Sequence, residues 1–320
     1  MGMKKIELHL HLEGAAPPAF IRGLAREKKV DISGIFDERG GYRFSGFPEF
    51  VRVYEAAVSV LTRPEDYARL MRAVLEAQVE EGVVYAEHFL CPDYCGGGDV
   101  GAFREYVLAM EEAAASVPEI TVRGIALMIR HMDPMQGRRA ALCAAEVAGG
   151  FVTGIGVAGN ERMGALRDFA WGIDCGREAG LGLTLHAGEL KGPEEVREAL
   201  ALGARRIGHG VRAIEDLALV DEIAEAGVVL ECCPGSNMAL GLYPGWRKHP
   251  IGELFHRGVK VTVSTDDPPF FHTTLRREYE LLSEAFDWDE GVFATLNRWA
   301  LDAAFCDKDT KEKIAKLMER

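Results

Sequence analysis

Short runs of β-type residues alternate along the chain with longer segments in which apolar residues follow helical spacing. In residues 6–13 (Ile-Glu-Leu-His-Leu-His-Leu-Glu), apolar and polar side chains alternate with the period of a β-strand. Seven further runs, rich in β-branched and apolar residues, have the length of buried strands. They cover residues 83–90, 122–129, 151–158, 183–186, 206–209, 228–232 and 259–264. The pattern therefore predicts eight strands, the first of them over residues 6–12.

The segments between these runs carry helix signals. Residues 193–200 begin with Pro and two Glu residues, and Gly203 follows where such a helix would stop. Residues 214–224 place apolar side chains three and four apart before Gly227. Alternating β and α units imply a parallel sheet, and eight units close most simply into a TIM-type (β/α)8 barrel. We therefore predict one α/β barrel domain over residues 1–320.

One connection is much longer than the others. Residues 15–82, between the first and second predicted strands, are too many for a single crossover helix, and Phe47, Phe50 and Tyr54 lie in their middle. Insertions after the carboxyl ends of barrel strands lie over the active-site face. We therefore predict a helical insertion in this segment that acts as a partial lid.

The composition is that of an ordinary globular protein. Of its 320 residues, 48% are hydrophobic and 27% are charged, and no apolar run is long enough to span a bilayer. A net charge of −13 argues against binding to nucleic acid or to an anionic membrane. Seven cysteines make no disulfide framework, which favours a cytoplasmic location. The sequence does not predict an oligomeric state.

Residues that can bind metal or transfer protons gather at the carboxyl ends of four predicted strands. They are His9 and His11 in the first strand, His186 and Glu189 at the fifth, His209 at the sixth, and Asp266 and Asp267 after the eighth. In a barrel these ends meet on one rim. Three histidines and one carboxylate suit a mononuclear zinc site with a position left for water. A lone His-x-His is more often structural, but four such pieces at four strand ends favour a metal centre.

The motifs at these strand ends resemble those of the adenosine/adenine deaminase family of the amidohydrolase superfamily. The similar stretches are ELHLHLEG (7–14), GIGVAGNE (154–161), HAGE (186–189), RIGHG (206–210), ECCPGSN (231–237) and STDDP (264–268). They span nearly the whole chain in the family's order and are specific as a set. The resemblance implies a metal-dependent hydrolase that removes the exocyclic amine of a 6-aminopurine, with a small-molecule purine or purine nucleoside as its partner.

The resemblance also implies a role for each residue. One Zn²⁺ per chain would be held by His9, His11, His186 and Asp266. Glu189 would protonate N1 of the purine, and His209 would lie beside the attacking water. Asp267 would hydrogen-bond N7, and the backbone N–H of Gly159 would approach the edge of the base. For this chemistry Glu189 must hold a proton near neutral pH, which requires a dry pocket that raises its pKa.

Two features of the sequence point to different substrates. Glu13 stands where typical adenosine deaminases have Asp, and Phe89 stands where many of them have Arg; both resemble adenine deaminases. Ala158–Glu161, in contrast, resembles the adenosine branch, and a glutamate at position 13 can still accept a hydrogen bond from a ribose hydroxyl. We therefore expect deamination of adenosine to inosine. The alternative is deamination of adenine to hypoxanthine, or of another 6-aminopurine nucleoside.

Other interpretations depend on fewer residues. Gly154–Gly159 matches G-x-G-x-x-G, which would favour a dinucleotide-binding oxidoreductase only if it opened a helix in a βαβ unit. A non-catalytic barrel that binds a purine would need neither Glu189 nor His209. His88 could face the rim as a substrate contact, although a packed strand histidine is the more common case.

Overall fold

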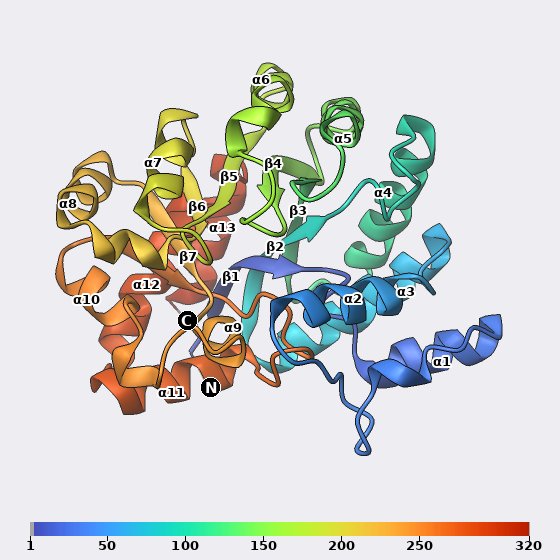
Figure 1. The fold of residues 1–320 in the computed structure, drawn as a ribbon, viewed down its shortest axis with the longest axis horizontal. Helices are drawn as coiled ribbons and strands as arrows, with labels where there is room; N and C mark the ends of the chain where they lie inside the picture. Colours follow the sequence, from blue (N-terminus) through green and yellow to red (C-terminus); the bar gives the residue numbers. More distant parts are fainter. Residues whose placement is uncertain (1–2, 320) are drawn as a thin grey trace.

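The computed structural model describes residues 3–319, in which eight parallel strands form a nearly closed barrel with helices around it (Figure 1). The strands pair in chain order, each with the next. Their bounds are β1 Lys5–His11, β2 Val83–Leu90, β3 Thr121–Ile129, β4 Val152–Ala158, β5 Gly182–Ala187, β6 Arg206–His209, β7 Val229–Cys232 and β8 Lys260–Val263. The predicted TIM-type fold and all eight predicted strands are confirmed, with ends that differ by at most one residue.

Just beyond β8, the backbone returns to β1. Asp266 forms a parallel bridge with Leu10, the Asp266 N–H donates to the His9 carbonyl, and the His11 N–H donates to the Asp266 carbonyl. The first and last strands therefore meet at the carboxyl rim of the barrel.

The helices begin and end where short-range signals place them. Their bounds are α1 Pro18–Lys28, α2 Phe47–Val58, α3 Pro64–Glu80, α4 Val100–Ala115, α5 Pro134–Glu146, α6 Ala170–Glu178, α7 Pro193–Ala201, α8 Leu217–Ala226, α9 Pro234–Ala239, α10 Ile251–His256, α11 Leu275–Phe286, α12 Glu290–Ala303 and α13 Lys308–Met318. Pro193 starts α7, as its sequence predicts. Asp216 accepts hydrogen bonds from the first N–H groups of α8, and Gly227 ends that helix in a left-handed conformation.

The long connection between β1 and β2 contains α1, α2 and α3. The last of these packs along α4 and serves as the ordinary crossover helix. The extra structure is therefore the α1–α2 part, and Figure 1 shows α1 extending away from the barrel. The Phe50 ring in α2 lies 5.1 Å from the Phe271 ring, and the Tyr42 ring stacks 3.8 Å from the Phe270 ring. Aromatic contacts thus attach this insertion to the loop after β8.

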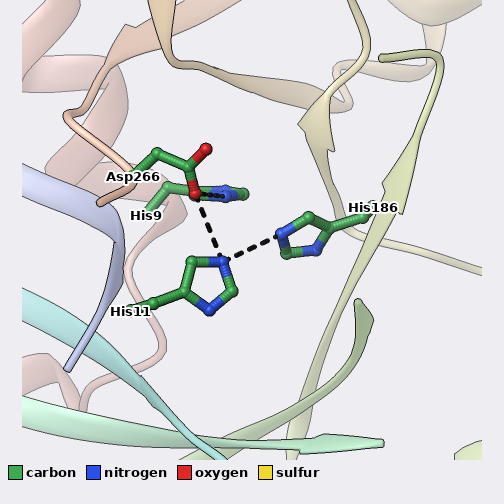
Figure 2. A group of neighbouring side chains, drawn as sticks. All are labelled: His9, His11, His186 and Asp266. Carbon is green, nitrogen blue, oxygen red and sulfur yellow. Dashed lines mark hydrogen bonds and ion pairs between the residues drawn. The ribbon is translucent and has the colours of Figure 1, made fainter. Parts of the chain in front are cut away.

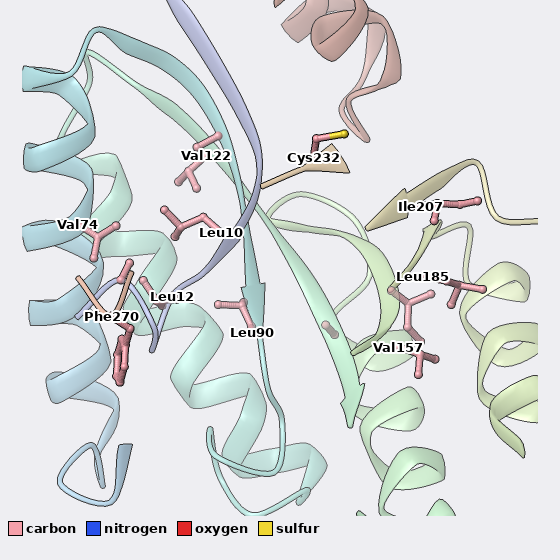
Figure 3. Close-up of a cluster of buried hydrophobic side chains, with 14 of the residues drawn as sticks. Leu10, Leu12, Val74, Leu90, Val122, Val157, Leu185, Ile207, Cys232 and Phe270 are labelled. Carbon is pink, nitrogen blue, oxygen red and sulfur yellow. The ribbon is translucent and has the colours of Figure 1, made fainter. Parts of the chain in front are cut away.

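Apolar side chains fill the layer between the strands and the helices, where Figure 3 shows Leu10, Val122 and Leu185 on three different strands. The barrel interior below the rim holds a charged residue instead. The Arg206 guanidinium is fully buried between Glu87, at 2.6 Å, and Glu231, at 2.5 Å, and it lies 3.7 Å from the centre of the Phe305 ring. Paired in this way, a buried cation is tolerated.

Two further findings concern the described part of the chain. No helix within residues 3–319 is both long and apolar enough to cross a membrane. The seven cysteines in the same range are all free thiols.

Candidate active site

Three histidines and one aspartate converge at the carboxyl rim of the barrel (Figure 2). His9 and His11 come from β1, His186 from β5, and Asp266 from the loop after β8; one ligand atom of each lies within 4.8 Å of the others. The Asp266 Oδ1 atom is 3.4 Å from His9 Nε2 and 3.3 Å from His11 Nε2, which is itself 3.3 Å from His186 Nε2.

These distances suit ligands of one metal ion. Atoms placed 2.0–2.1 Å from a single zinc ion in tetrahedral directions are about 3.4 Å apart. Hydrogen bonds alone leave the arrangement incomplete, because the buried Nε2 atom of His9 has no hydrogen-bond partner. Burial lowers the pKa of His11 and of His186, so both imidazoles are neutral, as metal binding requires.

Neighbouring side chains fix the orientation of these residues. His9 Nδ1 lies 2.8 Å from a Glu231 carboxylate oxygen, so its N–H donates there and Nε2 faces the cluster. The Ser236 hydroxyl donates to Asp266 Oδ2 at 2.7 Å. Asp266 itself has a φ of 64°, a left-handed conformation that is uncommon for a residue other than glycine. This backbone turn and its hydrogen bonds hold the carboxylate over the rim.

The cluster lies at one side of a cavity that the proton-transfer candidates also line. Part of the cavity wall is aromatic, with Phe47, Phe50 and Tyr54 from α2 and Phe271 from the loop after β8. Glu189 and His209 both line it, with 3.8 Å between their nearest carboxylate oxygen and imidazole nitrogen. Burial, followed by the charges of Asp266 and Glu161, raises the pKa of Glu189 well above its usual range. Burial lowers the pKa of His209 to about 3, which leaves this imidazole neutral.

Asp267 also faces this cavity, next to Asp266. Burial, followed by the charges of Asp266 and Glu189, raises the pKa of Asp267 well above its usual range. Its Oδ1 atom is buried without a hydrogen-bond partner, and a Cβ on Gly14 would overlap the carboxyl group. A neutral carboxyl with a free oxygen can donate a hydrogen bond to a ring nitrogen of a ligand.

The two predicted substrate contacts line the same cavity. Glu13 is only 2% exposed and accepts hydrogen bonds from the Tyr67 hydroxyl, at 3.2 Å, and from the Cys95 thiol, at 3.6 Å. Its burial raises the pKa of Glu13 to about 7. Gly159 has a φ of 97°, and a Cβ there would lie 2.6 Å from the His131 ring. Only glycine therefore fits at this point of the wall.

The structure also tests two other interpretations of the sequence. His88 is fully buried, with its Nε2 2.9 Å from Gln78 Oε1 in α3, so it is a packed strand histidine. The G-x-G-x-x-G stretch lies within β4 and the residue after it, and it opens no helix. The dinucleotide-binding interpretation is therefore wrong.

The cavity also contains residues that sequence reasoning did not single out. His131 follows β3 and accepts a hydrogen bond from the Asn160 N–H at its Nδ1 atom, and Tyr94 lines the same cavity. The position of His131 directly after a strand would have identified it, because that is where active-site residues of a barrel lie. Tyr94 lies further along the loop after β2 and carries no such signal.

A parallel (β/α)8 barrel with a histidine–aspartate cluster and a buried glutamate of raised pKa at its carboxyl rim defines a metal-dependent hydrolase of the amidohydrolase class. Within this class, the model of the adenosine deaminase family matches residues 4–320, and the chain belongs to that family.

Individual relatives and structures agree with this assignment. An adenine deaminase from Rhizobium leguminosarum bv. trifolii is 44% identical over 317 residues, which cover 98% of each chain. One from Agrobacterium fabrum is 44% identical over 97% of this chain and 96% of its own. The crystal structure of adenine deaminase from Arthrobacter aurescens superposes with a TM-score of 0.87 at 26% identity, covering 99% and 98%. A zinc-bound amidohydrolase from Burkholderia ambifaria, 24% identical with a TM-score of 0.85 and coverage of 99% and 90%, has the same fold.

Proposed function

We propose that this enzyme hydrolyses adenine to hypoxanthine and ammonia, with one Zn²⁺ per chain. The observation that carries the proposal is the convergence of Glu189, His209 and Asp267 on the cavity beside the histidine–aspartate cluster. The full-length similarity to adenine deaminases supports adenine as the substrate. Adenosine, which the sequence alone ranked first, has less support from these relatives.

The ion would be held by His9, His11, His186 and Asp266, whose spacing suits it, and the lowered pKa values of His11 and His186 favour the neutral form that binds metal. When bound, zinc acts as a Lewis acid and lowers the pKa of water toward about 7.

The remaining residues move protons around the purine ring. Glu189, kept neutral by its burial, donates a proton to N1, which makes C6 more open to attack by water. His209 accepts a proton from the attacking water and returns it to the amine, which leaves as ammonia. Asp267, whose carboxyl is also neutral, donates a hydrogen bond to N7. The second proton of the water, lost when the C6 hydroxyl becomes a carbonyl, returns to Glu189 and restores its neutral form. Water is consumed and the C–N bond at C6 is replaced by a C–O bond.

Glu13 gives a chemical reason for preferring the free base. Its carboxyl lies in the cavity wall and can accept a hydrogen bond from an imidazole N–H of adenine. Ribose on N9 would remove that donor and would also have to fit beside Tyr67 and Cys95. A site that hydrogen-bonds one group of its substrate discriminates strongly against an analogue that lacks this group.

The test is to measure ammonia release by the zinc-loaded enzyme from adenine, adenosine and other 6-aminopurine nucleosides. We expect kcat/KM for adenine to exceed that for adenosine by about 10²-fold or more. In the Glu13→Gln variant, adenine turnover should weaken by about 1–3 kcal/mol, the range for a spoiled buried hydrogen bond. A higher kcat/KM for adenosine would reject adenine as the preferred substrate. No ammonia release from any of these compounds would reject the whole proposal.

A further inference from the structure

Glu161 is a fully buried carboxylate in the loop that follows β4, and the proposed reaction gives it no task. It accepts hydrogen bonds from three successive backbone N–H groups after β5. The Glu189 N–H lies 3.1 and 3.2 Å from its two oxygens, and the N–H groups of Leu190 and Lys191 each lie 2.7 Å from Oε2. One side chain thus holds the backbone at the residue that we propose as the proton donor.

The local backbone brings these N–H groups together. Gly188 has a φ of 76°, a left-handed conformation in which a Cβ would lie 2.5 Å from the Val196 side chain. The turn at Gly188 lets the next three N–H groups point to a common centre, an arrangement that binds anions. An ionised carboxylate can accept all of them, because it has only acceptor sites.

The charge of Glu161 also lies close to the Glu189 side chain. Burial raises the pKa of Glu161, while the three N–H donors and the nearby Arg130 oppose this effect. Next to it, the Glu161 charge makes ionisation of Glu189 less favourable. Glu161 therefore both holds the backbone of Glu189 in place and favours the protonated form of its carboxyl group.

We propose that Glu161 is a positioning residue that sets the place of the Glu189 carboxyl and helps to keep it neutral. It holds the Glu189 backbone so that the side chain enters the cavity, 3.8 Å from His209. The inference rests on the proposed function, since it matters for catalysis only if Glu189 donates the proton.

Glu161 also connects the loops of two neighbouring βα units. It lies two residues after Gly159, which forms part of the cavity wall, and 28 residues before Glu189. A single short segment therefore places both a part of the wall and the proton donor. A shift of Glu161 would move Glu189 relative to the base, and a misplacement of about 1 Å can cost a factor of about 10² in rate.

The test compares Glu161→Gln with Glu195→Gln. Glu161→Gln leaves one acceptor oxygen and introduces an NH₂ group, which cannot accept hydrogen bonds from the backbone N–H groups. Glu195 is a matched control: it is also buried, it pairs with Arg130 and Lys191, and it accepts no hydrogen bond from the Glu189 backbone. Both variants are assayed as zinc-loaded enzymes for metal content, thermal unfolding and the pH dependence of kcat on adenine.

We expect Glu161→Gln to keep its metal and to lose about 10²-fold in kcat, with a much smaller change in KM. The alkaline limb of its kcat profile should move to lower pH, because Glu189 ionises more easily without the neighbouring charge. Glu195→Gln should keep the wild-type limb. A purely structural role would lower the folded fraction of Glu161→Gln and leave its pH profile unchanged, and that result would overturn the inference.

Glu161→Asp separates position from charge and also serves if the glutamine variant does not fold. It keeps the negative charge and shortens the side chain by one methylene. We expect the wild-type alkaline limb with a reduced kcat. Full kcat in this variant would overturn the positioning role while the proposed function stands. An inactive wild-type enzyme would overturn the proposed function and this inference with it.

Discussion

At the scale of single residues, the site depends on two non-glycine residues held in the left-handed backbone region. His209 has a φ of 60° and ends β6, and Asp266 has a φ of 64° and lies in the loop after β8. Such conformations cost about 1–3 kcal/mol each and persist only where the surroundings enforce them. The backbone hydrogen bonds between Asp266 and β1 enforce the left-handed conformation of Asp266. This conformation places the Asp266 carboxylate next to the histidines.

The first prediction concerns the metal ligands. His186→Ala removes one of the three imidazoles from the cluster and should lose both bound metal and activity. The fold should remain, because the barrel core lies below the rim. Elemental analysis and circular dichroism measure the two outcomes. His249→Gln, a change at a buried histidine outside the cluster, is the control and should retain its metal. Full occupancy in His186→Ala would refute the assignment.

The second prediction concerns the proton donor. Glu189→Gln keeps the shape of the side chain but cannot deliver a proton, so kcat should fall by roughly 10²–10⁴-fold with zinc retained. Single-turnover kinetics at saturating adenine measure this loss directly. A kcat close to that of the wild type would remove Glu189 from its proposed role.

The candidate metal-binding and proton-transfer residues could be predicted from the sequence where they lie at the end of a strand or just after it. His9, His186, His209 and Asp266 all lie at carboxyl ends that the β-period locates, and the barrel rule brings such ends together. Tyr67 and Cys95 could not be found in this way, although both contact Glu13. Their contacts depend on how α3 and the loop after β2 fold back over the rim, which no local pattern specifies.

At the scale of elements, two glycines in the barrel strands make room for an aromatic side chain from the loop between α12 and α13. Gly154 in β4 and Gly182 in β5 leave space for the Phe305 ring, which lies between α12 and α13. The Phe305 N–H donates to Glu87, and the ring covers the Arg206 guanidinium. These contacts fix the ring, so it cannot easily move aside.

The third prediction follows from that packing. Gly182→Ala places a methyl group where the Phe305 ring lies, and overpacking of this kind costs typically about 1–3 kcal/mol. The free energy of unfolding, measured with denaturant, should fall by that amount, while metal content stays unchanged because the rim is at the other end of the strands. Gly23→Ala, in α1, is a control with open space around it and a helical backbone that alanine adopts without strain, and it should lose no stability. Equal stability of Gly182→Ala and the wild type would show that the ring is free to shift.

The sequence located the strands within one residue but not the division of the segment between β1 and β2. It predicted that residues 15–82 contain a helical insertion but not which part; α3 is the ordinary crossover helix, and the α1–α2 part is additional. The distinction depends on which helix packs beside α4, a tertiary contact that periodicity does not contain. Its motion as a lid stays a prediction.

At the scale of the whole molecule, the ligand cluster joins three strands from different parts of the barrel. A bound ion would hold β1, β5 and the end of β8 together, and binding to the folded state alone stabilises it by about 4 kcal/mol at 1,000 times the dissociation constant. The fourth prediction is that removal of metal by a chelator lowers Tm and abolishes ammonia release, and that added Zn²⁺ restores both. A Tm that does not change on chelation would show that no metal is bound to the native barrel.

The meeting of β1 with the loop after β8 has a consequence for the protein during its synthesis. His9 and His11 leave the ribosome early, but Asp266 follows about 255 residues later, which is on the order of tens of seconds at ordinary translation rates. Throughout that time the nascent chain carries a pair of imidazoles without their carboxylate partner. The complete set of proposed ligands exists only after the last strand has been made. With these ligands, metal would be acquired late in the maturation of the enzyme, and a chain interrupted before residue 266 would carry only part of the set.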